Sequence, residues 1–266
     1  MDTENPPITS LLRFVGILEV LALAAAGIGL FFVYSVAAPL WPWDIKPFNA
    51  GFVGATYLGS LMAVVTMLVV SRWTPARLVL PMLLSFTGVV LIVSLLNLDR
   101  FHFDRWATWA WFALYIIVPL DSLYHLWLYR RLPPAQTVET SSMWRAYLVA
   151  QGIILGLYAL AMVIVPSTFT AFWPWAVDAF HAQMYAAIGF TAAAAAIALA
   201  RFAAPLDFLT LGLVQTVLGL LAILDVVLKS PLVNYSVGGT WLWLGGFAII
   251  SITGVAMIFH SRSMKR

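Results

Sequence analysis

Long apolar segments alternate with short polar ones along the whole chain. Eight apolar runs are each about 20 residues long, the length that an α-helix needs to cross the hydrocarbon core of a bilayer. They cover residues 12–38, 50–71, 77–98, 107–130, 144–165, 181–200, 206–228 and 240–260. Such runs are too long for the strands of a membrane barrel, and a helix satisfies its own backbone hydrogen bonds in lipid. The pattern therefore predicts an all-α integral membrane protein with eight transmembrane helices.

One motif in the polar segments occurs twice. Trp41-Pro42-Trp43 returns as Trp173-Pro174-Trp175, an offset of 173 − 41 = 132 residues. The same offset pairs Phe48 with Phe180, Ala50 with Ala182, Ala55 with Ala187, Trp109 with Trp241, Trp111 with Trp243, Arg13 with Arg145 and Glu19 with Gln151. Landmarks that recur at one spacing indicate an internal repeat. Each copy has an even number of spans, so we expect two parallel four-helix repeats related by a pseudo-twofold axis along the membrane normal.

The repeat sets the expected division of the chain. Residues 1–132 form the first four-helix repeat, 133–142 a polar, proline-containing cytoplasmic linker, and 143–266 the second four-helix repeat. The two halves and their tryptophan-proline-tryptophan connectors resemble a scattered group of bacterial multipass membrane proteins. The resemblance implies a multipass membrane protein and implies no particular chemistry.

Composition supports lipid as the solvent of most of the chain. The sequence is 63% hydrophobic and 9% charged, against roughly 25% charged residues in a soluble protein. Without cysteine, disulfides, thiolate catalysis and cysteine-ligated metals are excluded. The polar start, with Asp2 and Glu4, lacks the basic region and cleavage site of a secretory signal, so we expect the first apolar run to remain as a membrane helix.

Lys and Arg are distributed unequally between the two sides of the predicted bundle. The side that holds both termini carries Arg13, Arg72, Arg77, Arg130, Arg131, Arg145, Arg201, Arg262, Lys265 and Arg266, whereas the other carries Lys46, Arg100, Arg105 and Lys229. The positive-inside rule then predicts the cell inner (plasma) membrane with both termini cytoplasmic. Because the basic residues lie between apolar runs, the net charge of +3 indicates membrane topology. We therefore expect the lipid bilayer and other membrane subunits as partners, and no nucleic acid.

The tryptophan-rich connectors have two interpretations. Trp prefers the headgroup zone of a bilayer, so the connectors are interfacial anchors in the first interpretation. In the second, they line an aromatic mouth or lid on the outer side. The residues concerned are Trp41, Trp43, Trp106, Trp109, Trp173, Trp175, Trp241 and Trp243.

Ionisable residues inside the spans are the better candidates for function, because an uncompensated charge in lipid costs at least ~2.5 kcal/mol. Asp121, Tyr124 and His125 lie at i, i+3 and i+4 on one helix face, just after Pro119, which kinks the span. Such a group shuttles protons or holds a cation in one interpretation. In the other, Asp121 hydrogen-bonds a neighbouring helix and His125 is interfacial. Asp225 is expected to be neutralised by Lys229 at i+4.

Glu19 and its counterpart Gln151 leave the same choice open. Both are interhelical hydrogen-bonding residues near the pseudo-twofold axis, or Glu19 joins Asp121 and His125 in a polar cavity that faces the cytoplasm. At about 1.5 Å per residue, Glu19 lies about 9 Å deeper in the membrane than Arg13. We therefore expect the carboxyl groups of Glu19 and Asp121 in the cytoplasmic half of the membrane.

The sequence leaves three hypotheses for function. No haem, di-iron, phosphate-loop or metal-binding helix motif is present, so we expect no cofactor and no metal. The first hypothesis is a permease or lipophilic-ligand binder that uses Glu19, Asp121, Tyr124, His125 and Gln151. The second is an accessory subunit of a larger membrane complex, and the third is an intramembrane acid–base enzyme, an isomerase or cyclase, that uses Asp121 and His125. A cavity between the halves, a sealed core with a flat apolar flank, or an apolar pocket facing Asp121 would distinguish them.

Overall fold

The computed structural model describes residues 5–132 and 137–264, apart from the side chain of Phe202. Eight of the described helices are long and apolar enough to cross a membrane, so the chain is an all-α multipass membrane protein. They are α1 (Ser10–Phe32), α3 (Pro47–Val70), α4 (Trp73–Leu96), α5 (Trp106–Tyr129), α6 (Ser142–Ile164), α8 (Ala179–Arg201), α9 (Pro205–Leu228) and α10 (Gly238–Ser263). Each of them corresponds to one predicted run; positions 133–136 of the predicted linker lie outside the described residues.

Short elements connect the long helices. They are α2 (Tyr34–Ala37), η1 (Ala38–Leu40), η2 (Leu98–Arg100), α7 (Pro166–Thr170) and η3 (Ser230–Leu232), with two-residue strands β1 (Val138–Glu139) and β2 (Phe202–Ala203) paired antiparallel. The first predicted run, 12–38, is longer than α1 because the backbone leaves the helical region at Val33 (φ −129°, ψ 46°) and resumes as α2. The same break occurs at Val165 (φ −132°, ψ 62°), between α6 and α7.

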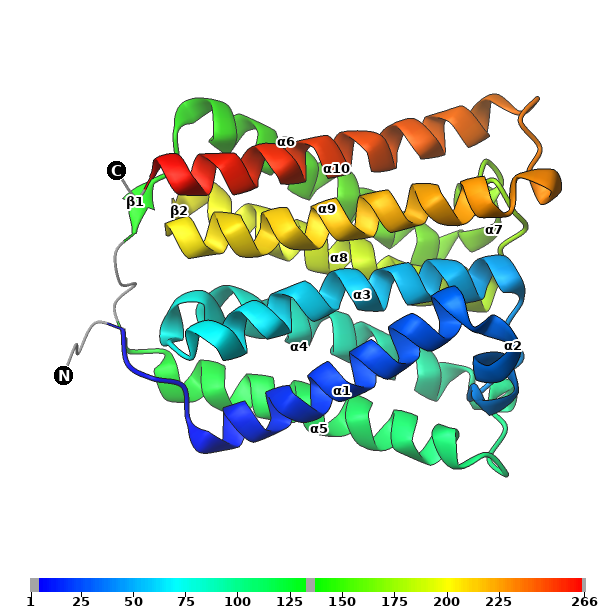
Figure 1. The fold of residues 1–266 in the computed structure, drawn as a ribbon, viewed down its shortest axis with the longest axis horizontal. Coiled ribbons are helices and arrows are strands. Elements are labelled where there is room, and N and C mark those ends of the chain that lie inside the picture. The colour runs from blue at the N-terminus through cyan, green and yellow to red at the C-terminus, as the bar shows by residue number, and fades with distance from the viewer. Residues whose placement is uncertain (1–4, 133–136, 265–266) are drawn as a thin grey trace.

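The helices lie side by side in one bundle with two distinct ends (Figure 1). At the terminal end α1 begins and α10 ends; at the tryptophan end the connectors that contain Trp41-Pro42-Trp43 and Trp173-Pro174-Trp175 link α1 to α3 and α6 to α8. Within each half, α1 packs on α3 and α4 on α5, and α6 packs on α8 and α9 on α10. The halves meet where α3 contacts α9 and α4 contacts α8, so these four helices form the centre of the bundle.

The contacts between the halves come in reciprocal pairs at the tryptophan end. Trp43 Nε1 donates to His181 Nε2 (3.1 Å), and Trp175 Nε1 donates to Asn49 Oδ1 (2.9 Å). Adding 132 to 43 and 49 gives 175 and 181, so each half reaches into the other with equivalent residues. Reciprocal contacts are what a twofold interface requires. They agree with the expected symmetry, while the duplication itself stays a prediction.

The packing of α9 on α10 differs from that of α4 on α5. In the second half, α9 and α10 approach through glycines: a Cβ on Gly254 would lie 2.8 Å from the carbonyl oxygen of Gly212, and one on Gly219 would lie 2.7 Å from that of Phe247. No side chain fits between the backbones there. In the first half, a cavity lies beside α4 and α5.

Candidate functional site

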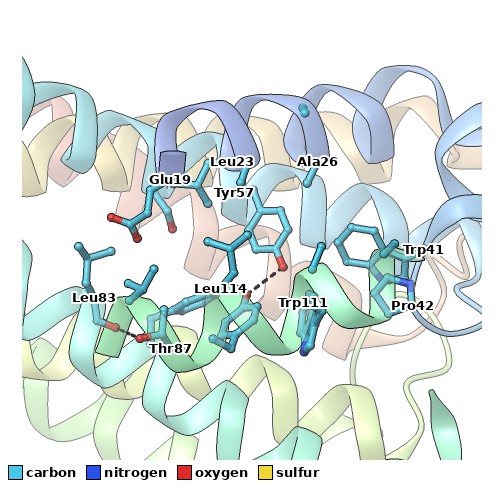
Figure 2. A pocket seen from close by; sticks show the side chains of 18 of the residues that line it. Glu19, Leu23, Ala26, Trp41, Pro42, Tyr57, Leu83, Thr87, Trp111 and Leu114 are labelled. Carbon is cyan, nitrogen blue, oxygen red and sulfur yellow. Dashed lines mark hydrogen bonds between the residues drawn. The ribbon is translucent and has the colours of Figure 1, made fainter. Parts of the chain in front are cut away.

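A large cavity lies inside the first half of the molecule. It has a volume of about 530 Å³ and is bounded by α1, α3, α4 and α5, with Thr191 of α8 as its contact with the second half. Figure 2 shows Glu19 at one end of this cavity, Trp41 and Pro42 at the other, and Tyr57 between them. The cavity therefore runs from the middle of the bundle toward the tryptophan end.

Small side chains on the outer helices make room for the cavity. From α1 it is lined by Ala22, Ala25 and Ala26, and from α5 by Ala107 and Ala110. The opposite wall is formed by larger apolar side chains of α4, namely Val79, Met82, Leu83 and Phe86. A concave, mostly apolar volume of this size is typical of sites for small lipophilic molecules.

Most polar groups in the wall are already hydrogen-bonded within the protein. The hydroxyl groups of Tyr57 and Tyr115 lie 3.0 Å apart, and Thr87 Oγ1 donates to the carbonyl oxygen of Leu83 (2.6 Å). Thr191 Oγ1 and Trp41 Nε1 are buried without a described partner. Glu19 is 5% exposed, and its side chain hydrogen-bonds no other described residue. The cavity thus contains one carboxyl group whose hydrogen-bonding capacity is unused.

Asp121 and His125 lie together beside the inner end of the cavity but do not line it. His125 Nδ1 is 2.9 Å from the Asp121 carbonyl oxygen and 3.2 Å from Oδ1, and its Nε2 is 2.6 Å from Thr9 Oγ1. Asp121 is close enough to Glu19 for their charges to interact. Tyr124 is 47% exposed, and its ring packs edge-on against that of His125 with the centroids 4.9 Å apart. The structure therefore brings Glu19, Asp121 and His125 into one region, with Tyr124 at its exposed edge.

Gln151, the counterpart of Glu19, lies in the other half of the molecule. Its Oε1 accepts a hydrogen bond from Gln215 Nε2 (3.1 Å), and both side chains are buried. This contact satisfies Gln151 within the second half, and the residue is not part of the cavity wall.

The predicted interfacial tryptophans divide into two groups. The buried ones pack together at the tryptophan end: Trp41, Trp43, Trp173, Trp175 and Trp243. The exposed ones are Trp106, Trp109 and Trp241. The exposed group lies on the outside of the bundle, whereas the connectors form an aromatic core. The position of all eight near a membrane surface stays a prediction. Of all these residues, Trp41 and Trp106 line the cavity.

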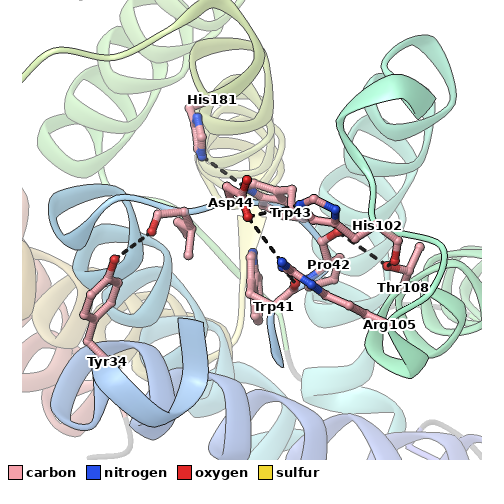
Figure 3. A network of polar contacts seen from close by, with 10 residues as sticks. Tyr34, Trp41, Pro42, Trp43, Asp44, His102, Arg105, Thr108 and His181 are labelled. Atoms are coloured by element: carbon pink, nitrogen blue, oxygen red, sulfur yellow. Dashed lines mark hydrogen bonds and ion pairs between the residues drawn. The ribbon is translucent and has the colours of Figure 1, made fainter. Parts of the chain in front are cut away.

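A polar network unique to the first half holds this end of the cavity together (Figure 3). Arg105 donates to the Trp41 carbonyl oxygen (2.7 Å) and to Asp44 Oδ1 (3.3 Å), and His102 Nε2 lies 3.0 Å from the same Oδ1. The hydrogen bond from His102 lowers the pKa of the exposed Asp44 carboxyl. The network joins the connector to the start of α5, next to Trp106.

The second half has no equivalent charged network. At the offset of 132 the positions of Asp44, His102 and Arg105 are occupied by Ala176, Asn234 and Val237. The charged network of Asp44, His102 and Arg105 and the cavity thus occur in the same half, at adjoining residues.

Two further acidic residues of the spans are paired with cations. Lys229 contacts Asp225, as the i,i+4 spacing predicts. Arg77 of α4 contacts the buried Asp207 of α9 at the terminal end, a pair that the sequence interpretation missed because Asp207 stands at a helix start. The first pair lies at the end of α9, and the second connects α4 to α9.

Tyr57 and Tyr115 were also missed as candidates. Comparing the two halves would have pointed to them, because the positions 132 residues later hold Gly189 and Phe247, which carry no hydroxyl group.

No protein-family model matches this chain, and neither a curated protein nor a solved structure shows significant similarity to it. The function is therefore argued from the cavity.

Proposed function

We propose that this protein binds a lipophilic ligand inside the membrane, in the cavity between α1, α3, α4 and α5. The observation that carries the proposal is the cavity itself: about 530 Å³, within the 300–1,000 Å³ typical of small-molecule sites. Its wall is apolar except for a few groups such as Glu19 and the Tyr57–Tyr115 pair. An apolar wall with a few placed polar groups favours a lipophilic molecule that is held in one orientation.

The lining and the volume of the cavity favour the binding of a lipophilic ligand over the other hypotheses. A permease for a polar solute needs polar groups along its path, whereas this wall is mostly alanine, large aliphatic and aromatic side chains. An acid–base enzyme that uses Asp121 and His125 needs both to face the ligand, and neither belongs to the wall. A purely structural subunit gains nothing from a void of this size, because unfilled volume in a core is destabilising.

Entry from the lipid is the simplest route to the cavity. Ala25, Leu40 and Trp106 belong to the wall and are also exposed on the outside of the bundle. The helices α1 and α5 touch, and they diverge toward the tryptophan end (Figure 1). A lipophilic molecule can then reach the site without crossing water.

The membrane placement that fits this proposal is the cell inner membrane with the terminal end in the cytoplasm. Ten Lys and Arg residues belong to that side of the sequence and four to the other, the asymmetry that the positive-inside rule describes. The reciprocal contacts of Trp43 and Trp175 support two repeats with a parallel orientation.

A pair of matched variants tests the proposal. Ala22 lines the cavity, and Ile154, its counterpart in the second half, is 65% exposed. Ala22→Phe places a ring in the cavity, and Ile154→Phe adds one at the outer surface. We expect bromohexadecane to quench the tryptophan fluorescence of the wild-type protein and of Ile154→Phe saturably, and that of Ala22→Phe without saturation. Equal quenching of all three proteins would contradict the proposal.

A further inference from the structure

We infer that the ligand is a single-chain amphiphile whose head group donates a hydrogen bond to Glu19 and whose chain extends toward the tryptophan end. A hydroxyl or an amine is the head group that fits. This inference rests on the proposed function, because it assigns the chemistry and the orientation of the molecule that the cavity holds.

The unused carboxyl group of Glu19 is the first argument. Its side chain is 95% buried by area (5% exposed), lines the cavity, and hydrogen-bonds no other described residue. A buried polar group without a partner costs free energy until a donor reaches it. Figure 2 shows the carboxyl at the inner end of the cavity, on the α1 side.

Other polar groups of the wall are less available to a head group. Tyr57 and Tyr115 hydrogen-bond each other, and Thr87 donates to its own helix. Thr191 Oγ1 and Trp41 Nε1 have no described partner, but both atoms are covered by the protein. Glu19 is therefore the acceptor that we assign to the head group.

Charge is the second argument, and it excludes an anionic head group at the inner end. No Lys or Arg belongs to the described wall, while Asp121 interacts with Glu19 from nearby. A carboxylate or phosphate placed there would find no cation in the described wall to offset its charge in a medium of low dielectric constant. At the other end Arg105 is a cation, but it already contacts Asp44 and the Trp41 carbonyl oxygen.

The shape of the cavity favours one extended chain. Its wall follows α5 from Trp106 to Val118, 13 residues whose 12 steps along the helix span about 18 Å. Toward the tryptophan end, past the hydrogen-bonded Tyr57 and Tyr115, the wall is aromatic, with Trp41, Trp106 and Trp111. A chain that starts at Glu19 thus ends among indole rings.

Brominated chains of equal length test the head group. The probes are hexadecanol, hexadecylamine and hexadecanoate, each with bromine on the last carbon, and binding is followed by tryptophan quenching at neutral pH. We expect the alcohol and the amine to bind at least about tenfold more tightly than the carboxylate, as one buried hydrogen bond implies. In Glu19→Gln this preference should fall to about twofold or less. Glu139→Gln, which changes a carboxyl group exposed on the surface, is the matched control.

The position of the bromine tests the orientation. Hexadecanol with bromine on the last carbon should quench more strongly than hexadecanol with bromine beside the hydroxyl group. The reverse order, or equal binding of all three head groups with Glu19→Gln unchanged, would overturn this inference. If Ala22→Phe still abolished binding in that case, the cavity would remain the ligand site. Failure of every probe to bind saturably would overturn the proposed function as well.

Discussion

At the scale of single residues, the buried carboxyl group of Glu19 defines the chemistry of the cavity. It is the one charged side chain among the described residues of the wall, and the same position in the second half carries the amide Gln151, which is paired with Gln215. An acidic group without a partner is expensive in a membrane, so its presence points to a ligand more than to stability.

The first prediction concerns the stability of the ligand-free protein. Glu19→Gln removes a buried ionisable group and leaves a neutral one of the same shape, so we expect the free energy of unfolding to stay unchanged or rise by about 1 kcal/mol. Thermal unfolding in detergent after removal of bound lipid measures this. A clear fall in the melting temperature would show that Glu19 has a structural role instead.

The second prediction concerns Asp178, which precedes α8 at the tryptophan end. Burial opposes its charge, but hydrogen bonds from the side chain and the backbone N–H of His181 outweigh this and lower the pKa of Asp178 from 3.8 to about 2. The ionised Asp178 carboxyl therefore contributes to the free energy of unfolding above about pH 4, and this contribution is lost as the pH falls toward 2. Because the carboxyl is half exposed, solvent screening reduces the effect to about 1 kcal/mol. Asp178→Asn should remove this acid dependence of unfolding, whereas Asp99→Asn should keep it.

At the scale of helices and connectors, packing at the two tryptophan motifs joins the halves. Trp43 and Trp175 are buried, and each donates its indole N–H across the interface to a residue of the opposite half. Sequence position alone predicted anchors at the membrane surface, because Trp prefers that zone. The connectors fold inward because reciprocal partners, His181 and Asn49, satisfy the indoles there.

The third prediction tests the close approach of α9 and α10. A Cβ on Gly254 would lie 2.8 Å from the Gly212 carbonyl oxygen, whereas one on Gly245, in the same helix, meets no atom within 4 Å. Gly254→Ala should therefore destabilise the protein by about 1–3 kcal/mol. Gly245→Ala should be neutral or stabilising by up to about 1 kcal/mol because alanine favours helix. Thermal unfolding compares them, and equal effects would contradict the packing described.

At the scale of the whole molecule, the two halves make reciprocal contacts but differ in their interiors: the first contains the cavity, and in the second α9 packs closely on α10. The spans could be predicted from apolar runs alone, since their length and hydropathy depend on local sequence. The cavity could not, because it depends on how the side chains of α1, α3, α4 and α5 pack in three dimensions, whereas glycines close α9 onto α10 in the second half. Glu19 and Asp121 were found because intramembrane charge is rare; Tyr57 and Tyr115 were missed because tyrosine in a span is ordinary.

The most direct test of the central claim is native mass spectrometry of the protein released from its own membrane. The account predicts a wild-type complex that carries one lipophilic molecule, retained in Ile154→Phe and absent from Ala22→Phe. A wild-type protein that is free of bound molecules, or an adduct that persists unchanged in Ala22→Phe, would contradict it.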